Sequence, residues 1–492
     1  MRKLALATIA YIAIFGALAL VRWNLWTYGT DTGTFAQVVG DAFGGFRDGP
    51  EQGTHFRFHW APILAVLAPL VSASRSGLIL QFAQIALVAA TAFPLFGIAR
   101  TYVSSSRAFA YAALALVYPP LCAVAFTEFH EIAFYPALAL ALVWAAERAR
   151  WRWFAVFAIA GALVREEACI VLAIVGAVFA GLGFTRRSAL GTRGEGLLAG
   201  TPREPERLAV AGLGLTLVNV AALGLYYRVV IPSVGAWQPS RFYDYAFAHG
   251  PVRLVAALAT HPTDAAQIFT VGRLTYLLEA LVPLAFLPLF SRWSGLAIPG
   301  LLVVLLSSDS IVWRMGSHYA AIWVPWLLLG ALATLVRARG QSSRRWYAAA
   351  LGACALFLIA INPMHVGHYV RAAYPHDDAA RALATLAPDA DVVMHDEWFA
   401  HVAFAHPHAT VFFCPSARYA VFADDYPNGY YRAEIRPEIA REVASGRMRV
   451  AATFGSVRVY TRVPSGDGRA HRCITPGDVR YTTLSAALAA GR

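Results

Sequence analysis

Tyr28-Gly-Thr-Asp31-Thr-Gly-Thr-Phe35-Ala-Gln37 and His55-Phe-Arg57-Phe-His59-Trp60-Ala-Pro62 are the two ends of one stretch, which lies between the first and the second hydrophobic run. A Gly-rich segment separates them. A carboxylate, two histidines, an arginine and several aromatic side chains are concentrated here. Where this stretch lies relative to the hydrophobic runs decides both the fold and the place of any chemistry.

The composition is that of a polytopic membrane protein. Of the 492 residues, 58% are hydrophobic and only 14% are charged, whereas soluble domains carry about 25% charged residues. The net charge of +12 comes mostly from arginines in loops and in the C-terminal tail, so we do not expect nucleic-acid binding. Met1-Arg2-Lys3 precedes the run 4–21, which lacks a convincing cleavage site and is expected to be an uncleaved first span.

Eleven hydrophobic runs are candidates for crossing about 30 Å of hydrocarbon. They are 4–21, 77–99, 108–126, 132–147, 153–164, 168–184, 208–231, 273–290, 295–306, 320–336 and 347–361. Pro62 and Pro69 bracket a shorter run, 61–73, which predicts an interfacial or re-entrant helix. The expected fold is therefore an all-α bundle of about eleven transmembrane helices over residues 1–362, with a first outer loop at 22–61.

Basic side chains determine the expected orientation, because Lys and Arg are enriched in cytoplasmic loops. With the N-terminus inside, the inner segments contain Arg2, Lys3, Arg100, Arg107, Arg148, Arg150, Arg152, Arg186, Arg187, Arg193, Arg203, Arg207, Arg292, Arg337, Arg339, Arg344 and Arg345. The outer loops are longer and carry the acidic residues. We expect a multi-pass protein of the plasma membrane with a cytoplasmic N-terminus and an extracytoplasmic C-terminal part.

After residue 362 the hydrophobic runs shorten to strand length and the charge rises. Segments 391–394, 410–413 and 449–452 predict strands, and 377–386 and 435–445 predict helices. We expect residues 363–492 to form a small extracytoplasmic α/β domain. Cys414 and Cys473 fall in this compartment, where disulfides persist; a bridge between them and two unpaired thiols both remain open.

The outer turns bring ionisable residues from distant parts of the chain to one membrane face. These residues are Asp31, His55, Arg57, His59, Glu128, His130, Glu131, Arg165, Glu166, Glu167, Asp309, Arg314 and His318, followed by Tyr319. Ionisable groups at or inside the hydrocarbon are costly and mark functional sites. Interfacial loops are polar in any case, so a single such residue carries little weight; the tight turns at 128–131 and 165–167 carry more.

Two kinds of chemistry fit this set. A carboxylate can act as a general base while histidines and arginines hold a phosphate. The same mixture of carboxylates and histidines could instead bind a divalent cation such as Mg²⁺ or Mn²⁺. Glu279 lies inside the run 273–290; it could line the same cavity, but we favour a structural ion pair with Arg273.

Several short motifs resemble the DUF2079 family of predicted membrane proteins. They are Asp31-Thr-Gly-Thr-Phe-Ala-Gln37, His59-Trp-Ala-Pro62, Tyr118-Pro-Pro120, Glu128-Phe-His130-Glu131, Val164-Arg-Glu-Glu-Ala168 and Ser317-His-Tyr319. The resemblance covers most of residues 25–335 and the C-terminal domain less clearly. The family commonly has Asp-Leu-Gly and Lys-Glu-Asp where this chain has Asp31-Thr-Gly and Arg165-Glu-Glu. With arginine at 165, a proton-donating role there is not expected.

The family is similar to the GT-C superfamily of glycosyltransferases, which take sugar from a polyprenyl-phosphate carrier. The resemblance implies that Asp31, in the first outer loop, matches the acidic residue that activates the acceptor. We therefore expect an inverting glycosyltransferase that binds membrane lipid and a polyprenyl-phosphate-linked sugar. The expected catalytic residues are Asp31, His59, Glu128, His130 and Glu166. The expected substrate-binding residues are Arg57, Glu131, Arg165, Arg314, His318 and Tyr319.

Two alternatives remain open at the level of sequence. A lipid or polysaccharide transporter would also need polar groups among its helices, although no paired broken helices in repeated halves are evident. A non-catalytic assembly or sensor protein, with the outer domain as its working part, is the other. The donor sugar, the acceptor, the metal and the oligomeric state do not follow from the sequence.

Overall fold

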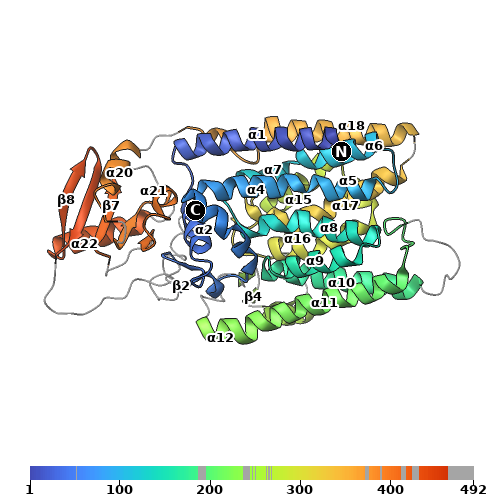
Figure 1. The fold of residues 1–492 in the computed structure, drawn as a ribbon, viewed down its shortest axis with the longest axis horizontal. Helices are drawn as coiled ribbons and strands as arrows, with labels where there is room; N and C mark the ends of the chain where they lie inside the picture. The colour runs from blue at the N-terminus through green and yellow to red at the C-terminus, as the bar shows by residue number, and fades with distance from the viewer. Residues whose placement is uncertain are drawn as a thin grey trace.

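The computed structural model describes residues 1–50, 53–186, 196–235, 269–338, 340–371, 376–387, 390–411, 417–423 and 432–463, with short pieces between 244 and 266. Most of these residues form one body of helices that run side by side (Figure 1). A small sheet lies at one end of this body, and the N-terminus lies away from it (Figure 1).

Within the part of the chain that the structure describes, five helical segments are long and apolar enough to cross a membrane. They are α1 (Arg2–Asn24), α4 with α5 (Leu78–Ala90, Ala92–Ala99), α10 (Glu166–Arg186), α11 (Pro205–Leu225, continued by the π-helix Tyr226–Val230 and α12, Ile231–Val234) and α18 (Gly340–Leu356, continued by the π-helix Phe357–Ile361). A sixth candidate is α6 with α7 (Ser105–Leu116, Pro119–Phe126), bent by 52°. Pro119 and Pro120 explain the bend, because proline lacks the N–H that would continue the ladder of α6.

The remaining helices are shorter. They are α3 (Ala68–Ser74), α8 (Tyr135–Glu147), α9 (Trp151–Ala162), α14 (Pro251–Thr260), α15 (Val271–Leu281), α16 (Ile298–Leu305), α17 (Val324–Arg337) and α19 (Val366–Tyr369). Short 3₁₀ turns precede several of them: η1 (His55–Arg57), η2 (Pro62–Leu67), η3 (Glu131–Phe134), η8 (Arg292–Ala297) and η9 (His318–Ile322). Every hydrophobic run expected to span coincides with helical structure, and the mainly helical fold is confirmed. The segment 61–73 is also helical, as η2 and α3.

Large aromatic side chains hold the helices together in the core. Trp326 of α17 donates its ring N–H to the hydroxyl of Tyr135 in α8 at 3.1 Å, and Trp323 donates to Tyr276 of α15 at 2.8 Å. Tyr118 in turn donates to the carbonyl of Ala280 at 2.6 Å. These side chains bury much apolar area while their polar ends remain bonded, so helices distant in sequence are fixed relative to one another.

The C-terminal part contains a five-stranded sheet of order β6-β5-β7-β9-β8. Its strands are β5 (Val392–Met394), β6 (Ala409–Thr410), β7 (Tyr419–Ala423), β8 (Met448–Phe454) and β9 (Val457–Arg462), and its helices are α20 (His376–Leu383), α21 (Asp396–Val402) and α22 (Arg432–Ala444). β5 pairs in parallel with β6 and β7, and β9 pairs antiparallel with β7 and β8. The sequence predicted β5, β8, α20 and α22, but not β7, β9 or α21. Its strand at 410–413 overlaps β6 only at Thr410.

Helix α2 (Thr30–Gly40) connects the helical body to the sheet (Figure 1). Its Gln37 side chain donates to the carbonyls of His406 and Ala409 at 3.0 and 3.3 Å and accepts from the amide of Gly49 at 2.8 Å. Ala36 is buried in the same apolar cluster as the sheet. The C-terminal part therefore helps to position the helix that carries Asp31.

Gly33 allows this close approach. A Cβ atom at this position would lie within 3.0 Å of three carbon atoms of the Phe399 ring in α21. We expect Gly33→Ala to cost about 1–3 kcal/mol through overpacking, seen as a lower melting temperature and faster proteolysis of the C-terminal part. Phe399→Leu in the same chain should recover part of the loss.

A matched control for this change is available on α11. A Cβ at Gly214 would meet nothing within 4 Å, and alanine is the better helix former. Gly214→Ala should therefore be neutral or slightly stabilising. Equal behaviour of the two variants would contradict the tight packing at Gly33.

The expected ion pair between Glu279 and Arg273 is wrong. Arg273 donates instead to the carbonyl of Ser307 at 2.8 Å and lies 5.2 Å from the centre of the Trp313 ring. Residues six positions apart in an α-helix lie on different faces, so the side chains of Arg273 and Glu279 point in different directions.

Three of the five cysteines lie among the residues that the structure describes. Cys122, Cys169 and Cys354 are buried free thiols, as expected. Cys414 and Cys473, for which a bridge was considered, lie outside the residues that the structure describes.

Candidate functional site

Asp31 lies in the first turn of α2 and faces His130. Its Oδ2 is 3.4 Å from Nε2 of His130, and about half of the Asp31 side chain (54%) is exposed. The other ring nitrogen of His130, Nδ1, is 3.0 Å from the carbonyl oxygen of Glu128 and therefore carries a hydrogen. A second hydrogen on Nε2 suits the facing carboxylate. Burial lowers the pKa of His130, but the charge and hydrogen bond of Asp31 outweigh this and raise it.

Glu128 holds the beginning of α2. Its Oε1 accepts from the amide of Gly29 at 3.0 Å, and its Oε2 accepts from the amide and hydroxyl of Thr32 at 2.9 and 3.2 Å. The first amides of a helix have no partner within the helix, and a negative charge suits that end. Burial and the nearby Asp31 raise the pKa of Glu128 to about 7. Both carboxylate oxygens thus fix the backbone on either side of Asp31.

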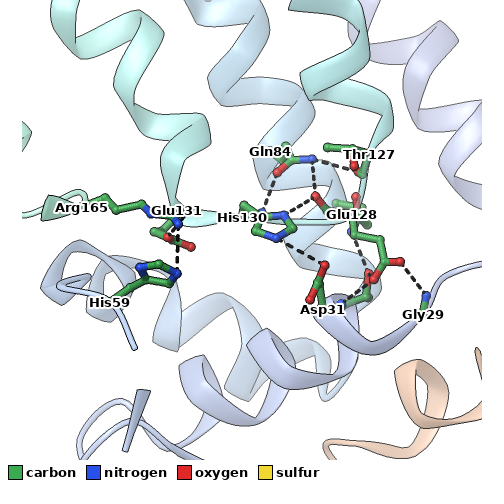
Figure 2. A network of polar contacts seen from close by, with 11 residues as sticks. Gly29, Asp31, His59, Gln84, Thr127, Glu128, His130, Glu131 and Arg165 are labelled. Carbon is green, nitrogen blue, oxygen red and sulfur yellow. Dashed lines mark hydrogen bonds and ion pairs between the residues drawn. The ribbon is translucent and has the colours of Figure 1, made fainter. Parts of the chain in front are cut away.

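Gln84 of α4 completes this half of the site, as Figure 2 shows. Its side-chain oxygen accepts from the amide of His130 at 2.9 Å, and its nitrogen donates to the carbonyls of Thr127 and Glu128 at 3.0 and 3.1 Å. Sequence reasoning missed Gln84. An amide side chain inside the hydrophobic run 77–99 was the signal that could have found it.

Arg165 is the centre of the other half of the site. Its three guanidinium nitrogens lie 3.1 Å from Oε1 of Glu131, 2.8 Å from Oε2 of Glu167 and 2.9 Å from Nε2 of His59. Arg165 is 2% exposed and Glu131 is fully buried. Burial, the largest single effect, raises the pKa of Glu131, but Arg165 and the nearby histidines together outweigh it and lower the pKa to about 2.

His59 joins Arg165 to Glu166. Its Nδ1 is 2.7 Å from Oε1 of Glu166, whose Oε2 accepts from the amide of Trp60 at 2.9 Å. Burial and Arg165 lower the pKa of His59 to about 3, so the ring is neutral. A neutral ring can donate from Nδ1 to Glu166 and accept at Nε2 from Arg165.

The two halves are contiguous. His130 and Glu131 are neighbours in one turn, and each contacts one half (Figure 2). The ring of Phe35 lies 5.4 Å from that of His130 and 5.3 Å from that of His55. His318 stacks on His130 with ring centres 3.4 Å apart, which adds the turn at η9.

The remaining predicted residues lie at the edge of this cluster or outside it. Tyr319 is 5.7 Å from the guanidinium carbon of Arg165. Arg57 is half-buried and donates to the carbonyl of Gly235 at 3.3 Å. Arg314 is exposed, in a turn where the Ser317 hydroxyl donates to the Arg314 carbonyl at 2.7 Å. The exposed Arg314 thus differs from Arg165, which is buried among carboxylates.

Arg22 is a further buried charge that sequence reasoning did not select. It is 2% exposed, and its guanidinium lies 4.1, 4.8 and 4.3 Å from the ring centres of Tyr28, Phe126 and Tyr369. It donates to the carbonyl of Thr27 at 3.0 Å. Cation–π contacts of this kind strengthen when water is excluded, so Arg22 fixes the end of α1 beside α2.

A cavity of about 660 Å³ lies along the other side of α2. Its walls come from α2, from the hairpin β1–β2 (Arg47–Asp48, Gly53–Thr54) and from the segment between α21 and β7. Gln37, Asp41, Asp48, Asp391 and Phe404 are among its lining residues. The hairpin leads directly into His55, and α2 carries Asp31 as well as Ala36, Gln37 and Gly40 of the cavity lining.

The groups around Arg165 include residue types that bind metal ions. His59, Glu166 and Glu167 offer ligand atoms within 4.8 Å of one another, and such ligands suit Zn²⁺ or Mn²⁺. The guanidinium of Arg165, however, already contacts both His59 and Glu167. An ion at this place would be repelled by it, so the residues as arranged do not fit a divalent cation.

The pair of Asp31 and His130 has a testable pH dependence. A histidine whose folded-state pKa is raised stabilises the fold below its unfolded pKa of about 6.5, and this stability is lost as the pH rises through the folded pKa. We expect the melting temperature of wild type to exceed that of His130→Gln most at acidic pH and less at alkaline pH. Thermal unfolding in detergent across this range measures it.

His318→Gln is the control for that experiment. Burial and the nearby His130 lower the pKa of His318, so its linkage to pH has the opposite sign, and wild type should gain on this variant as the pH rises. A difference for His130→Gln that does not change with pH would contradict the ion pair.

The family model described as "Predicted membrane protein (DUF2079)" matches residues 21–372. Among solved structures, ArnT from Cupriavidus metallidurans bound to undecaprenyl phosphate is similar with a TM-score of 0.50 and 14% identity, covering 94% of this chain and 99% of that chain. The Archaeoglobus fulgidus oligosaccharyltransferase with Zn and sulfate follows with 0.43 and 13%, covering 84% and 68%. No curated protein matches the chain. At this identity the likeness to ArnT indicates a shared fold.

Proposed function

The chain belongs to the DUF2079 family of predicted membrane proteins, and we propose that it is a GT-C-type glycosyltransferase that takes sugar from a polyprenyl-phosphate donor. The observation that carries the proposal is Asp31. It is the half-exposed carboxylate of a cluster whose other acidic groups are bonded or buried. The ArnT structure of similar fold holds undecaprenyl phosphate, which supports a lipid-phosphate carrier.

The proposed topology follows the distribution of basic residues. Eleven crossings with a cytoplasmic N-terminus would put α2, the cluster and the C-terminal domain (363–492) on the extracytoplasmic side of the plasma membrane. In Figure 1 the sheet and α2 are at the same end of the helical body, which supports this arrangement.

In the proposed reaction Asp31 is the general base. It takes the proton of an acceptor hydroxyl as that oxygen attacks the anomeric carbon, and the bond from this carbon to the phosphate oxygen breaks. The configuration inverts, the proton stays on Asp31, and the electron pair leaves with the polyprenyl phosphate. His130 orients the carboxylate, and Glu128 fixes the backbone that carries it, so both are positioning residues.

The arginines outside the buried cluster are the proposed phosphate contacts. Arg314 is exposed and Arg57 is half-buried, and their guanidinium groups suit the two charges of a departing phosphate. Arg165 and Glu131 are buried in their own ion pair; we propose that with His59, Glu166, His318 and Tyr319 they support the floor of the site. The cavity beside α2 is the proposed path of the acceptor.

The test is turnover by the purified protein in lipid nanodiscs. Polyprenyl-phosphate-linked hexoses are supplied with a cell-envelope extract as acceptor, and the polyprenyl phosphate released is measured by mass spectrometry. Release that depends on the extract supports a transferase. Binding of polyprenyl phosphate without release from any donor would favour a transporter or a non-catalytic protein.

A further inference from the structure

The cluster around Arg165 has the composition of a metal site but already contains a cation. Three carboxylates, those of Glu131, Glu166 and Glu167, and one imidazole, that of His59, surround a single guanidinium. All three guanidinium nitrogens are within 3.1 Å of a carboxylate oxygen or a ring nitrogen. Because Arg165 is 2% exposed, water contributes little to its solvation and these groups replace it.

We propose that Arg165 is a resident cation that occupies the place a divalent metal ion would take, so that this site works without a metal. The relevance to catalysis rests on the proposed function, whereas the binding experiment below does not require turnover.

The bonding of the candidate ligands supports this assignment. The one lone pair of the His59 ring, on Nε2, faces Arg165, and Nδ1 donates to Glu166, so neither ring nitrogen is available to an ion. The second oxygen of Glu166 accepts from the amide of Trp60. Glu167 places Oε2 2.8 Å from Nε of Arg165. His59 and Glu166 are thus held by hydrogen bonds, and Glu131 and Glu167 lie at ion-pair distance from the guanidinium.

The charge balance gives the assignment a consequence. Methionine at 165 would keep much of the length of the side chain and remove its charge, leaving the carboxylates without a cation. Zn²⁺ and Mn²⁺ accept one imidazole together with carboxylates, and the ligand atoms of His59, Glu166 and Glu167 are already within 4.8 Å of one another. Arg165→Met should therefore create a divalent-cation site that wild type lacks.

The experiment uses the full-length protein in detergent with Mn²⁺ or Zn²⁺ alone as probe. After chelation and re-addition, metal content is measured by mass spectrometry, Mn²⁺ binding by electron paramagnetic resonance, and melting temperature with and without the ion. We expect no stoichiometric metal and no effect of chelator for wild type and Arg165→Lys. For Arg165→Met we expect one bound ion per chain and a melting temperature that rises with ion concentration.

Two further results decide the matter. Adding Glu167→Gln to Arg165→Met should abolish ion binding, which separates a built site from adventitious surface binding. Stoichiometric metal in wild type, or a folded Arg165→Met that binds none, would overturn the proposal. If Arg165→Met does not fold, wild type and Arg165→Lys still test it. Metal content does not distinguish a metal-free transferase from a metal-free protein without transferase activity. The turnover assay distinguishes them, so the two proposals can fail separately.

Discussion

Asp31→Asn should lower sugar transfer by a factor of about 10² to 10⁴, the usual contribution of a positioned general base. Asparagine keeps the shape of the side chain but cannot take the acceptor proton. About half of the Asp31 side chain is exposed, and it pairs with His130, so removal of its charge should change the melting temperature little at alkaline pH, where His130 is neutral. Release of polyprenyl phosphate measures the first effect and thermal unfolding in detergent measures the second.

Asp378→Asn is the matched control. Asp378 lies in the first turn of α20, as Asp31 lies in the first turn of α2, and it pairs with the exposed Arg381. A surface pair of this kind contributes about 0–1 kcal/mol, and α20 belongs to the C-terminal part of the chain. Transfer should therefore survive this substitution. Wild-type transfer by Asp31→Asn would remove Asp31 from the role of base.

The sequence predicted which residues would meet, because membrane helices constrain their ends to two faces. Asp31, His130, Arg165 and His318 each follow or precede a hydrophobic run, and the distribution of basic residues assigned those ends to one face. Spatial proximity followed from that assignment without any knowledge of how the helices pack. This is why turns far apart in the chain could be grouped from the sequence.

The pairing within the group could not be predicted in this way. Whether Glu128 faces a substrate or the amides of Gly29 and Thr32 depends on side-chain direction and on the exact position of α2. The neutralisation of Arg165 depends in the same way on Glu131 and Glu167 converging from different turns. Periodicity contains no information about either.

The C-terminal sheet shows a second limit. β7 and β9 were missed, although Val457-Arg-Val459 at the start of β9 alternates apolar and charged residues, a signal that could have found it. Their pairing with each other and with β5 depends on contacts between distant segments. The contact of α21 with α2 likewise depends on the absence of a side chain at Gly33, a feature that is visible only once Phe399 is in place.

The arginines near the site are of two kinds, which differ in burial and in their ion pairs. Arg165 is enclosed by acidic groups, whereas Arg314 is exposed and Arg57 is half-buried. A phosphate would have to displace buried carboxylates to contact Arg165, whereas Arg314 is open to water. Arg165 therefore stabilises the structure of the site, and we expect its substitution to lower the stability of the protein.

Arg165→Met should destabilise the protein by about 3–5 kcal/mol at neutral pH, as expected when one partner of a buried ion pair is removed. The pH dependence has a definite sign. Arg165 holds the pKa of Glu131 down to about 2, and a depressed carboxyl pKa stabilises the fold above the unfolded value of about 4.3 and loses this effect as the pH falls through the folded value. The difference in melting temperature between wild type and Arg165→Met should thus be largest at neutral pH and shrink toward pH 2.

Arg165→Lys is the comparison that isolates geometry from charge. An ammonium group keeps the positive charge but cannot reach Glu131, Glu167 and His59 at the same time as a planar guanidinium does. Its loss of stability should therefore be smaller than that of Arg165→Met, with a similar decline toward low pH. Equal stability of wild type and Arg165→Met at neutral pH, measured without added metal, would show that the three carboxylates do not depend on Arg165 for their charge balance.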